Sequence, residues 1–223
     1  MPPMEQAGQV IVAVLCMGGF FALFVLLAIF GARQRAQAQA AWSAFAQETG
    51  MQLSGVYPMF SFHGSWGGAA VSLMHTMHRG HKGSRHYAHH VSVQLPVHTG
   101  DLMMDREGFF DTIGKAFGGQ DIQIGDAVFD PSFRVRCSSE ELARSVLGPG
   151  VRQALLRAVQ QLPSLHVEGG RIGVRQPGIA TPTTLRPQID ALVAVANAFA
   201  QQQGSYTAPT SGGNPYGNPY GMS

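Results

Sequence analysis

An unbroken apolar segment near the N-terminus constrains this chain more than any other feature. Residues 10–30 contain no charged side chain, and Arg33 and Arg35 follow within five positions. As a helix this segment is about 31 Å long, which matches the hydrocarbon core of a bilayer. The sequence therefore predicts a transmembrane helix with a folded domain tethered behind it.

The charges on either side of this segment predict its orientation. Glu5 is the only charged residue before it, whereas Arg33 and Arg35 follow it, and positive charge marks the cytoplasmic end of a span. We therefore expect a single-pass protein of the inner (plasma) membrane, with its N-terminus outside and its C-terminal domain in the cytoplasm. The alternative is a cleaved signal peptide, but such peptides have a basic start and an apolar stretch of only about 7–15 residues.

The few cysteines and the small net charge narrow the class of protein. Cys16 and Cys137 are the only cysteines, so no disulfide framework holds the domain together, which fits a reducing compartment. Cys137 precedes a predicted helix start, where the helix dipole stabilises a thiolate, but a small side chain at a strand end is the simpler interpretation. A formal charge of +2 is too small for a general nucleic-acid binder, so no nucleic acid is expected as a partner.

Composition and periodicity divide the chain into five parts. These are a short N-terminal segment (1–9), a transmembrane helix (10–30), a juxtamembrane amphipathic helix (31–49), a soluble α+β domain (50–203) and a disordered tail with two Asn-Pro-Tyr-Gly repeats (204–223). Trp42 and Phe45 lie on the apolar face of the juxtamembrane helix, and Gly50 ends it. We expect this face to pack on the domain rather than in the lipid interface.

Two hairpins with glycine-containing turns begin the domain. Residues 60–66 and 69–75 alternate apolar and polar side chains on either side of a Gly-Gly turn, which places Phe62 opposite Leu73. A second turn over 79–85 leads into a strand over 86–95. One face of this sheet is apolar, and the other is expected to be wet because it carries Ser61, His63, Ser65 and Ser72.

The remaining sequence alternates strands and helices. In order, we expect a strand at 102–104, a helix at 107–117, a strand at 133–136, a helix opened by a capping box of Ser138 and Glu141, a helix at 151–162, a Gly-Gly hairpin with Glu168 opposite Arg171, and a last helix capped by Thr184. Together these elements predict an α+β fold, in which the N-terminal transmembrane helix is followed by an antiparallel β-sheet with helices packed on one face.

A short motif precedes the C-terminal helices. Residues 129–135 read Phe-Asp-x-x-Phe-x-Val, and a short helix, a Leu-rich helix and a Gly-Gly hairpin follow. This stretch resembles a family of uncharacterised bacterial membrane-anchored proteins, a domain of unknown function, whose soluble α+β domain bears an FD-x-x-F-x-V motif. The likeness covers roughly residues 40–200. The resemblance implies a fold and a topology, and it supplies no catalytic residue.

The residue types of this motif suit a structural role. Phe129 and Phe133 are core residues by type, and Asp130 before Pro131 suits a turn whose carboxylate accepts backbone N–H groups. The alternative is that Asp126 and Asp130 are paired ligands of a cation. Calcium takes at least six oxygen ligands, and no third acidic residue lies nearby.

Histidines are concentrated in the second hairpin. Seven of the nine lie between His75 and His98. Closing the turn over 79–85 places His78 opposite His86 with His81 at the tip, so these three are the candidate metal ligands. Residues 61–100 contain no Cys, Asp or Glu that would orient such ligands, so a solvated polar hairpin is the alternative.

The same hairpin is basic. Arg79, Lys82 and Arg85 are candidates for contact with a lipid or a partner, because a basic residue near the inner leaflet gains about 1 kcal/mol from anionic lipids. Three such charges would assist docking on a membrane, but they would not be enough to produce it alone.

The sequence contains no hydrolase, P-loop or dinucleotide-binding motif. We therefore expect a non-enzymatic binding or scaffolding module at the cytoplasmic face of the membrane, with an unknown protein partner and no cofactor. Two alternatives stay open. One is a metal-binding or metal-sensing protein that holds a transition metal with the His-rich hairpin, and the other is an anionic-lipid-binding module.

Overall fold

The computed structural model describes residues 3–80, 83–106 and 121–205, with side chains in those ranges between residues 19 and 202. Its elements are α1 (Pro3–Thr49), β1 (Gln52–Val56), β2 (Met59–Trp66), β3 (Ala69–Arg79), β4 (Arg85–Gln94), β5 (Met103–Arg106), β6 (Phe133–Arg136), α2 (Glu140–Val146), α3 (Pro149–Gln161), β7 (Leu165–Glu168), β8 (Arg171–Pro177) and α4 (Pro182–Ser205). The expected helix at 107–117 and residues 206–223 of the expected tail lie outside the described residues.

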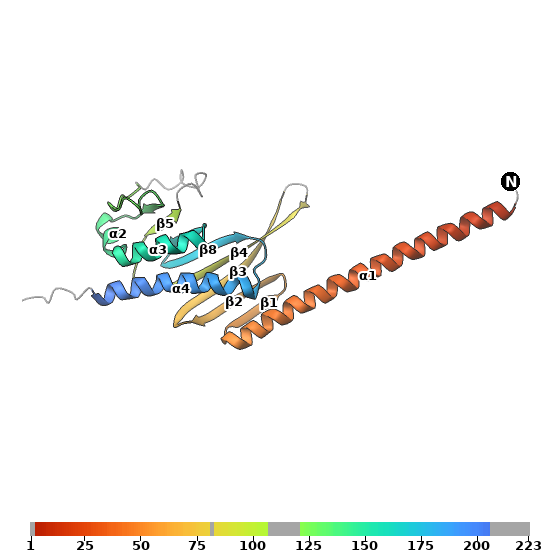
Figure 1. The fold of residues 1–223 in the computed structure, drawn as a ribbon, viewed down its shortest axis with the longest axis horizontal. Coiled ribbons are helices and arrows are strands. Elements are labelled where there is room, and N and C mark those ends of the chain that lie inside the picture. Colours follow the sequence, from red (N-terminus) through yellow and green to blue (C-terminus); the bar gives the residue numbers. More distant parts are fainter. Residues whose placement is uncertain (1–2, 81–82, 107–120, 206–223) are drawn as a thin grey trace, which may run out of the picture.

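Helix α1 joins the two helices expected at 10–30 and 31–49 into one continuous helix that extends from the domain (Figure 1). Gly50, with a φ of 68°, follows its last residue, as expected for a helix end. Among the described residues, this helix is the one long and apolar enough to cross a membrane. Its side chains at Phe20, Phe24 and Phe30 are 76%, 70% and 61% exposed, so the domain leaves this segment uncovered.

The last turns of α1 dock on the domain through aromatic packing. Trp42 and Phe45 are 2% and 3% exposed, and the Trp42 ring lies 4.7 Å from the Phe60 ring and 5.2 Å from the Phe62 ring between centroids. Burial of aromatic side chains of this size dominates core energetics. The expectation that this face packs on the domain is confirmed.

The sheet has eight strands, all antiparallel, in the order β1-β2-β3-β4-β8-β7-β5-β6. The expected register of both hairpins is confirmed, with Phe62 opposite Leu73 and His78 opposite His86. Gly67 and Gly68 both have positive φ, as a two-residue hairpin turn of this kind requires. Strand β1 was not expected, and the β7–β8 hairpin inserts between β4 and β5, which are consecutive in sequence.

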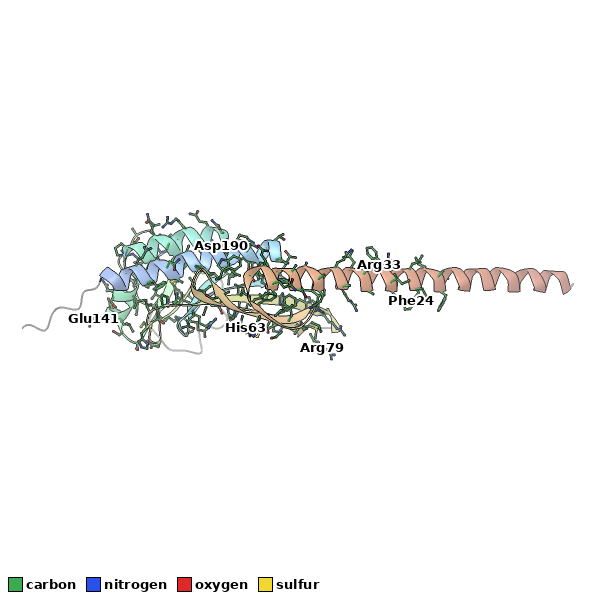
Figure 2. All side chains as sticks on the ribbon, turned by 90° about the horizontal axis from the view of Figure 1, so that it is seen from below. Phe24, Arg33, His63, Arg79, Glu141 and Asp190 are labelled. Atoms are coloured by element: carbon green, nitrogen blue, oxygen red, sulfur yellow. The ribbon has the colours of Figure 1, made fainter. Side chains whose placement is uncertain are left out.

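Helices α1, α3 and α4 lie on one side of this sheet, as Figure 2 shows for α4, where Asp190 is labelled, and for α1. The core between the helices and the sheet includes Phe62, Leu73, Val91, Val93, Ile172, Val174, Leu185, Ile189, Leu192 and Phe199, all fully or almost fully buried. The apolar residues of α4 recur every three or four positions, so one stripe of the helix faces the sheet. The expected α+β fold, with helices on one face of an antiparallel sheet, is confirmed.

Two helix caps differ from expectation. The N-cap of α2 is Ser139, whose hydroxyl accepts from the Leu142 N–H, because the Ser138 N–H and hydroxyl are both bonded to Asp101. Helix α4 begins at Pro182, three residues earlier than a cap at Thr184 implies. Proline favours the first helical position because it has no N–H to satisfy there.

The two carboxylates of the Phe-Asp motif hold a turn rather than each other. Asp130 accepts from the N–H groups of Ile124, Gly125 and Asp126 at 2.8–3.1 Å. Asp126 accepts from two further N–H groups and from the Arg152 guanidinium at 2.9 Å, and these bonds hold the pKa of its carboxyl below its usual value. The contacts fit the structural interpretation, because each carboxylate is already occupied by donors.

Replacing Asp130 by Ala is therefore expected to lower the free energy of unfolding by about 2–3 kcal/mol, because three N–H groups lose their acceptor. Urea unfolding of the full chain in neutral detergent, followed by tryptophan fluorescence, measures this loss. Glu141→Ala, at an exposed position, is the control and should change stability by less than about 0.5 kcal/mol. A midpoint that rises with added Ca²⁺ in the parent chain would instead favour a cation site.

Candidate functional site

The side of the sheet away from the helices is lined by polar and ionisable residues. Strand pairing aligns His63, Ser72, Ser92, Gly173, His166, Asp105 and Arg134 in one row across seven strands. None of the described helices α1, α3 and α4 lies on this side, where Figure 2 shows His63. We call this surface the polar face, and it includes the residues two positions along each strand from this row.

Two histidines meet on the polar face. His90 of β4 and His166 of β7 approach to 3.1 Å between their Nε2 atoms, with the rings nearly parallel at 22°. Gly173 of β8 separates their strands, and a Cβ there would lie only 2.7 Å from the His90 Nε2. The absence of a side chain at residue 173 is thus what allows the two rings to meet.

The hydrogen bonds assign a tautomer to this pair. The Nδ1 of His166 lies 3.1 Å from the Ser164 carbonyl oxygen, which only accepts, so His166 carries its proton on Nδ1. Its Nε2 is then an acceptor, and the His90 Nε2–H donates to it. In the neutral pair, both nitrogens of His166 and the Nε2 of His90 have partners without a ligand.

Burial and neighbouring positive charge keep this pair neutral. Desolvation, together with the charges of His166, Arg175 and Arg171, lowers the pKa of His90 to about 4. Desolvation also lowers the pKa of His166, and Arg175 acts with it, whereas the Ser164 carbonyl, Glu168 and Asp105 act against it. The charges that lower the pKa of His90 are thus those of its neighbours on the same face, chiefly His166 and the two arginines of β8.

Arg171 lies flat across three strands of the polar face. Its Nε donates to Ser92 Oγ at 3.0 Å, one Nη to Gln94 Oε1 at 3.0 Å and the other to Ser72 Oγ at 2.9 Å. All three acceptors are neutral. Glu168 pairs with Arg171 in backbone register, yet its carboxylate contacts Arg175 instead, at 4.0 Å.

Carboxylates lie at the far end of the same face. Asp121 bridges Arg134 and Arg136, each at 3.3 Å, so one negative charge faces two positive ones. The pKa of the neighbouring Asp105 carboxyl is raised by desolvation, which the two arginines oppose. The two carboxylates and the two guanidinium groups therefore balance in formal charge at this end of the face.

Two other histidines face the helices and are structural. His75 places Nδ1 3.2 Å from the Phe60 carbonyl and accepts the Ala180 N–H at Nε2, at 3.1 Å. His89 places Nδ1 3.1 Å from the Gly178 carbonyl. These bonds tie the connection between β8 and α4 to the sheet, and desolvation lowers the pKa of His75.

The predicted metal ligands lie on the exposed end of the β3–β4 hairpin. His78 and His86 are register partners, and each bonds a hydroxyl two residues earlier in the chain: His78 bonds Thr76 at 3.4 Å and His86 bonds Ser84 at 3.0 Å. His81 and Lys82 lie outside the described residues. Among the residues that are described, no group of three or more His, Cys, Asp or Glu is placed to hold a metal ion.

Cys137 is placed unlike a nucleophile. Its thiol donates to Asp101 at 3.2 Å, and desolvation, with the Asp101 carboxylate, raises the thiol pKa. A thiol in this setting is mostly protonated at neutral pH. The contacts agree with the interpretation of Cys137 as a small side chain at a strand end.

The pairing of His90 with His166 was not predicted from the sequence. Alternation along β4 and β7 assigns both residues to the polar side of their strands, which was the available signal. It does not show that these strands lie on either side of β8, which brings together two residues 76 positions apart.

Comparisons with known proteins establish no family for this chain. No protein-family model matches it, and no curated protein matches it either. A solved structure, the mycobacterial trehalose monomycolate transport factor A (TtfA), aligns over 74% of this chain and 93% of its own, with 14% sequence identity and a TM-score of 0.44. Likeness at this level identifies neither a shared fold nor a shared activity.

The hypothesis of a metal site in the hairpin predicts stoichiometric, submicromolar binding of Zn²⁺, Cu²⁺ or Ni²⁺ by the untagged full chain in detergent. Substituting Ala for His78, His81 and His86 together should abolish it, because three imidazoles would be lost. Isothermal titration measures the binding. A variant with Gln at His90 and His166 is the control, and equal weak binding by all three proteins would refute the hypothesis.

Proposed function

We propose that this chain is a membrane-anchored, non-enzymatic binding module whose polar face contacts a protein partner at the cytoplasmic side of the inner membrane. The observation that carries the proposal is the asymmetry of the sheet. Helices cover its apolar side, while its other side is a broad surface of His, Arg and Ser side chains. The core needs only the apolar side, so the polar side is available for contact.

The continuous helix α1 supports the anchoring role. Its apolar side chains between residues 20 and 30 are exposed, and exposed apolar runs of this size are costly in water. Trp42 follows Phe30 by 12 residues, so the domain begins about 18 Å from the end of the apolar segment. Arg33 and Arg35 favour the cytoplasmic side for the domain.

The packing of the reactive side chains supports a role in binding rather than catalysis. The Cys137 thiol has a raised pKa, the Asp126 and Asp130 carboxylates accept backbone N–H groups, and the His90–His166 pair satisfies itself. Catalytic groups generally combine a perturbed pKa with access to a substrate cleft. These side chains instead stabilise the fold or line an open surface.

Site-specific photocrosslinking in cells tests this proposal. We expect benzoylphenylalanine at Ala70 or Met74, exposed positions on the polar face, to yield a discrete crosslinked protein band in the membrane fraction. The same residue at Gln160 or Asn197, exposed on the helices, is the matched control and should yield none. Identical patterns from both surfaces, or none from the polar face, would refute this role for the face.

A second candidate function is contact with anionic lipid. It is favoured by the position of the β3–β4 hairpin, whose end lies level with the end of the apolar segment of α1. The Tyr57 N–H donates to Gln39 of α1 at 2.9 Å, and Phe60 contacts His75, so this part of β3 lies beside Gln39. From His75, β3 runs about 13 Å further to Arg79. The same rise along α1 leads from Gln39 to about residue 30, where the apolar segment ends.

Figure 2 agrees, since Arg79 lies at the end of the domain toward Arg33. The basic residues Arg79 and Arg85 would therefore meet the headgroup layer. Each is expected to gain about 1 kcal/mol from anionic lipids, which docks the hairpin without needing a specific lipid pocket.

This candidate predicts that an environment-sensitive fluorophore at Ser84→Cys, with Cys16 and Cys137 replaced by Ser, brightens more in phosphatidylglycerol nanodiscs than in phosphatidylcholine ones. High salt should remove the difference, because it screens exposed charges. Arg79→Gln/Arg85→Gln should also remove it, whereas the matched double variant Arg144→Gln/Arg157→Gln should not. Equal fluorescence in both lipids would exclude this contact.

A further inference from the structure

Arg171 carries a positive charge for which the described part of the chain provides no close counter-charge. Its three hydrogen bonds end on Ser72, Ser92 and Gln94. Within the described residues it makes no ion pair, and the carboxylate of its register partner Glu168 lies against Arg175. A guanidinium has five N–H donors, so two remain for a ligand above the face.

Arg175, four positions along the same strand, has only a distant counter-charge. Its side chain is 52% exposed, and its only ion pair among the described residues is the 4.0 Å contact with Glu168. Exposed pairs at such distances contribute little. Side chains four positions apart on a strand point to the same side, about 13 Å apart at their Cα atoms, so two cationic groups flank the imidazole pair.

The position of these arginines separates them from the membrane. Ser92 and Gly173 share the sheet row of Ser72, seven residues along β3 from Arg79. At about 3.3 Å per residue, the row between Arg171 and Arg175 lies roughly 23 Å further from the headgroups than the end of the hairpin does. Because charges are screened beyond about 8–10 Å in physiological salt, lipid headgroups do not neutralise them.

From this arrangement we propose that the polar face binds an acidic segment of a partner protein, with carboxylates received by Arg171 and Arg175 on either side of the His90–His166 pair. This inference rests on the proposed function and names the chemistry of its partner. An extended acidic chain presents carboxylates on one side at multiples of about 7 Å, so two such steps match the separation of about 13 Å between the Cα atoms of Arg171 and Arg175. Arginine binds carboxylates through two parallel hydrogen bonds.

The imidazole pair makes this binding depend on protons. In the described part of the protein, the charged groups facing the pair are Arg171 and Arg175 from β8, Glu168 from β7, Asp105 from β5, and Arg134 and Arg136 from β6, with Asp121 paired to the last two. Carboxylates arriving beside the two β8 arginines offset the field that disfavours imidazolium. The bound complex therefore takes up a proton more readily, and affinity rises as the pH falls.

Fluorescence anisotropy of a labelled oligoglutamate peptide, added to the full chain in neutral detergent, tests the inference. We expect saturable binding that weakens about tenfold or more in Arg171→Gln/Arg175→Gln, since each charge-assisted bond contributes substantially. Arg144→Gln/Arg157→Gln removes the same charge from the helix layer and should bind like the parent chain. Affinity should rise several-fold between about pH 7 and about pH 5, because binding raises the pKa of His90 from about 4, and His90→Gln/His166→Gln should lose that dependence.

Equal weakening by both arginine pairs would overturn the inference, because it would reflect net charge alone. Displacement of the peptide by millimolar inorganic phosphate, with direct phosphate binding lost in the Arg171/Arg175 variant, would assign the site to a small oxyanion instead. Circular dichroism of each variant identifies any loss of fold, and Arg171→Lys/Arg175→Lys, which keeps the charge, should restore part of the binding.

The peptide and crosslinking experiments together separate the acidic-partner hypothesis from the proposed function. If oligoglutamate does not bind while Ala70 and Met74 still crosslink to a protein, the polar face has a partner that is not acidic. If crosslinking also fails, the polar face is not the binding surface.

Discussion

Aromatic packing between α1 and the sheet is the contact on which the arrangement of this protein depends. Trp42 and Phe45 bury themselves against Phe60 and Phe62, so a helix that begins in an apolar segment ends inside the domain core. Because one unbroken helix contains both the apolar segment and the residues that pack on the sheet, no flexible linker separates the two. Figure 2 shows the consequence, since Arg79, at the end of the β3–β4 hairpin, lies at the end of the domain toward Arg33.

The same packing explains why the two sides of the sheet differ so strongly. The helices take the apolar side, and two histidines on that side, His75 and His89, serve as hydrogen-bonding clamps for the connection into α4. The polar side is free to collect ionisable groups that would be costly in a core. There a glycine in β8 makes room for the His90–His166 pair, and arginines without close carboxylate partners lie on both sides of it.

Local pattern accounted for much of the fold. Alternation and Gly-Gly turns predicted the registers of the β2–β3 and β7–β8 hairpins, and a heptad-like spacing predicted the buried faces of α1 and α4. Caps were less predictable, because Ser138 and Ser139 are equivalent by type until Asp101 occupies the first. Strand β1 was missed, since a five-residue edge strand with one half-buried residue carries little periodic signal.

By itself, the sequence determined the apolar helix, the class of fold, the paired hairpins and which side chains share a strand face, because these depend on residues within a few positions of one another. Only the tertiary structure decided that β7 and β8 insert between β4 and β5. That choice brings His166 to His90 and lays Arg171 across Ser72 and Ser92, over separations of 76 to 99 residues. Strand order is decided by which edges and faces fit together in the complete core, and no periodicity within one strand records it.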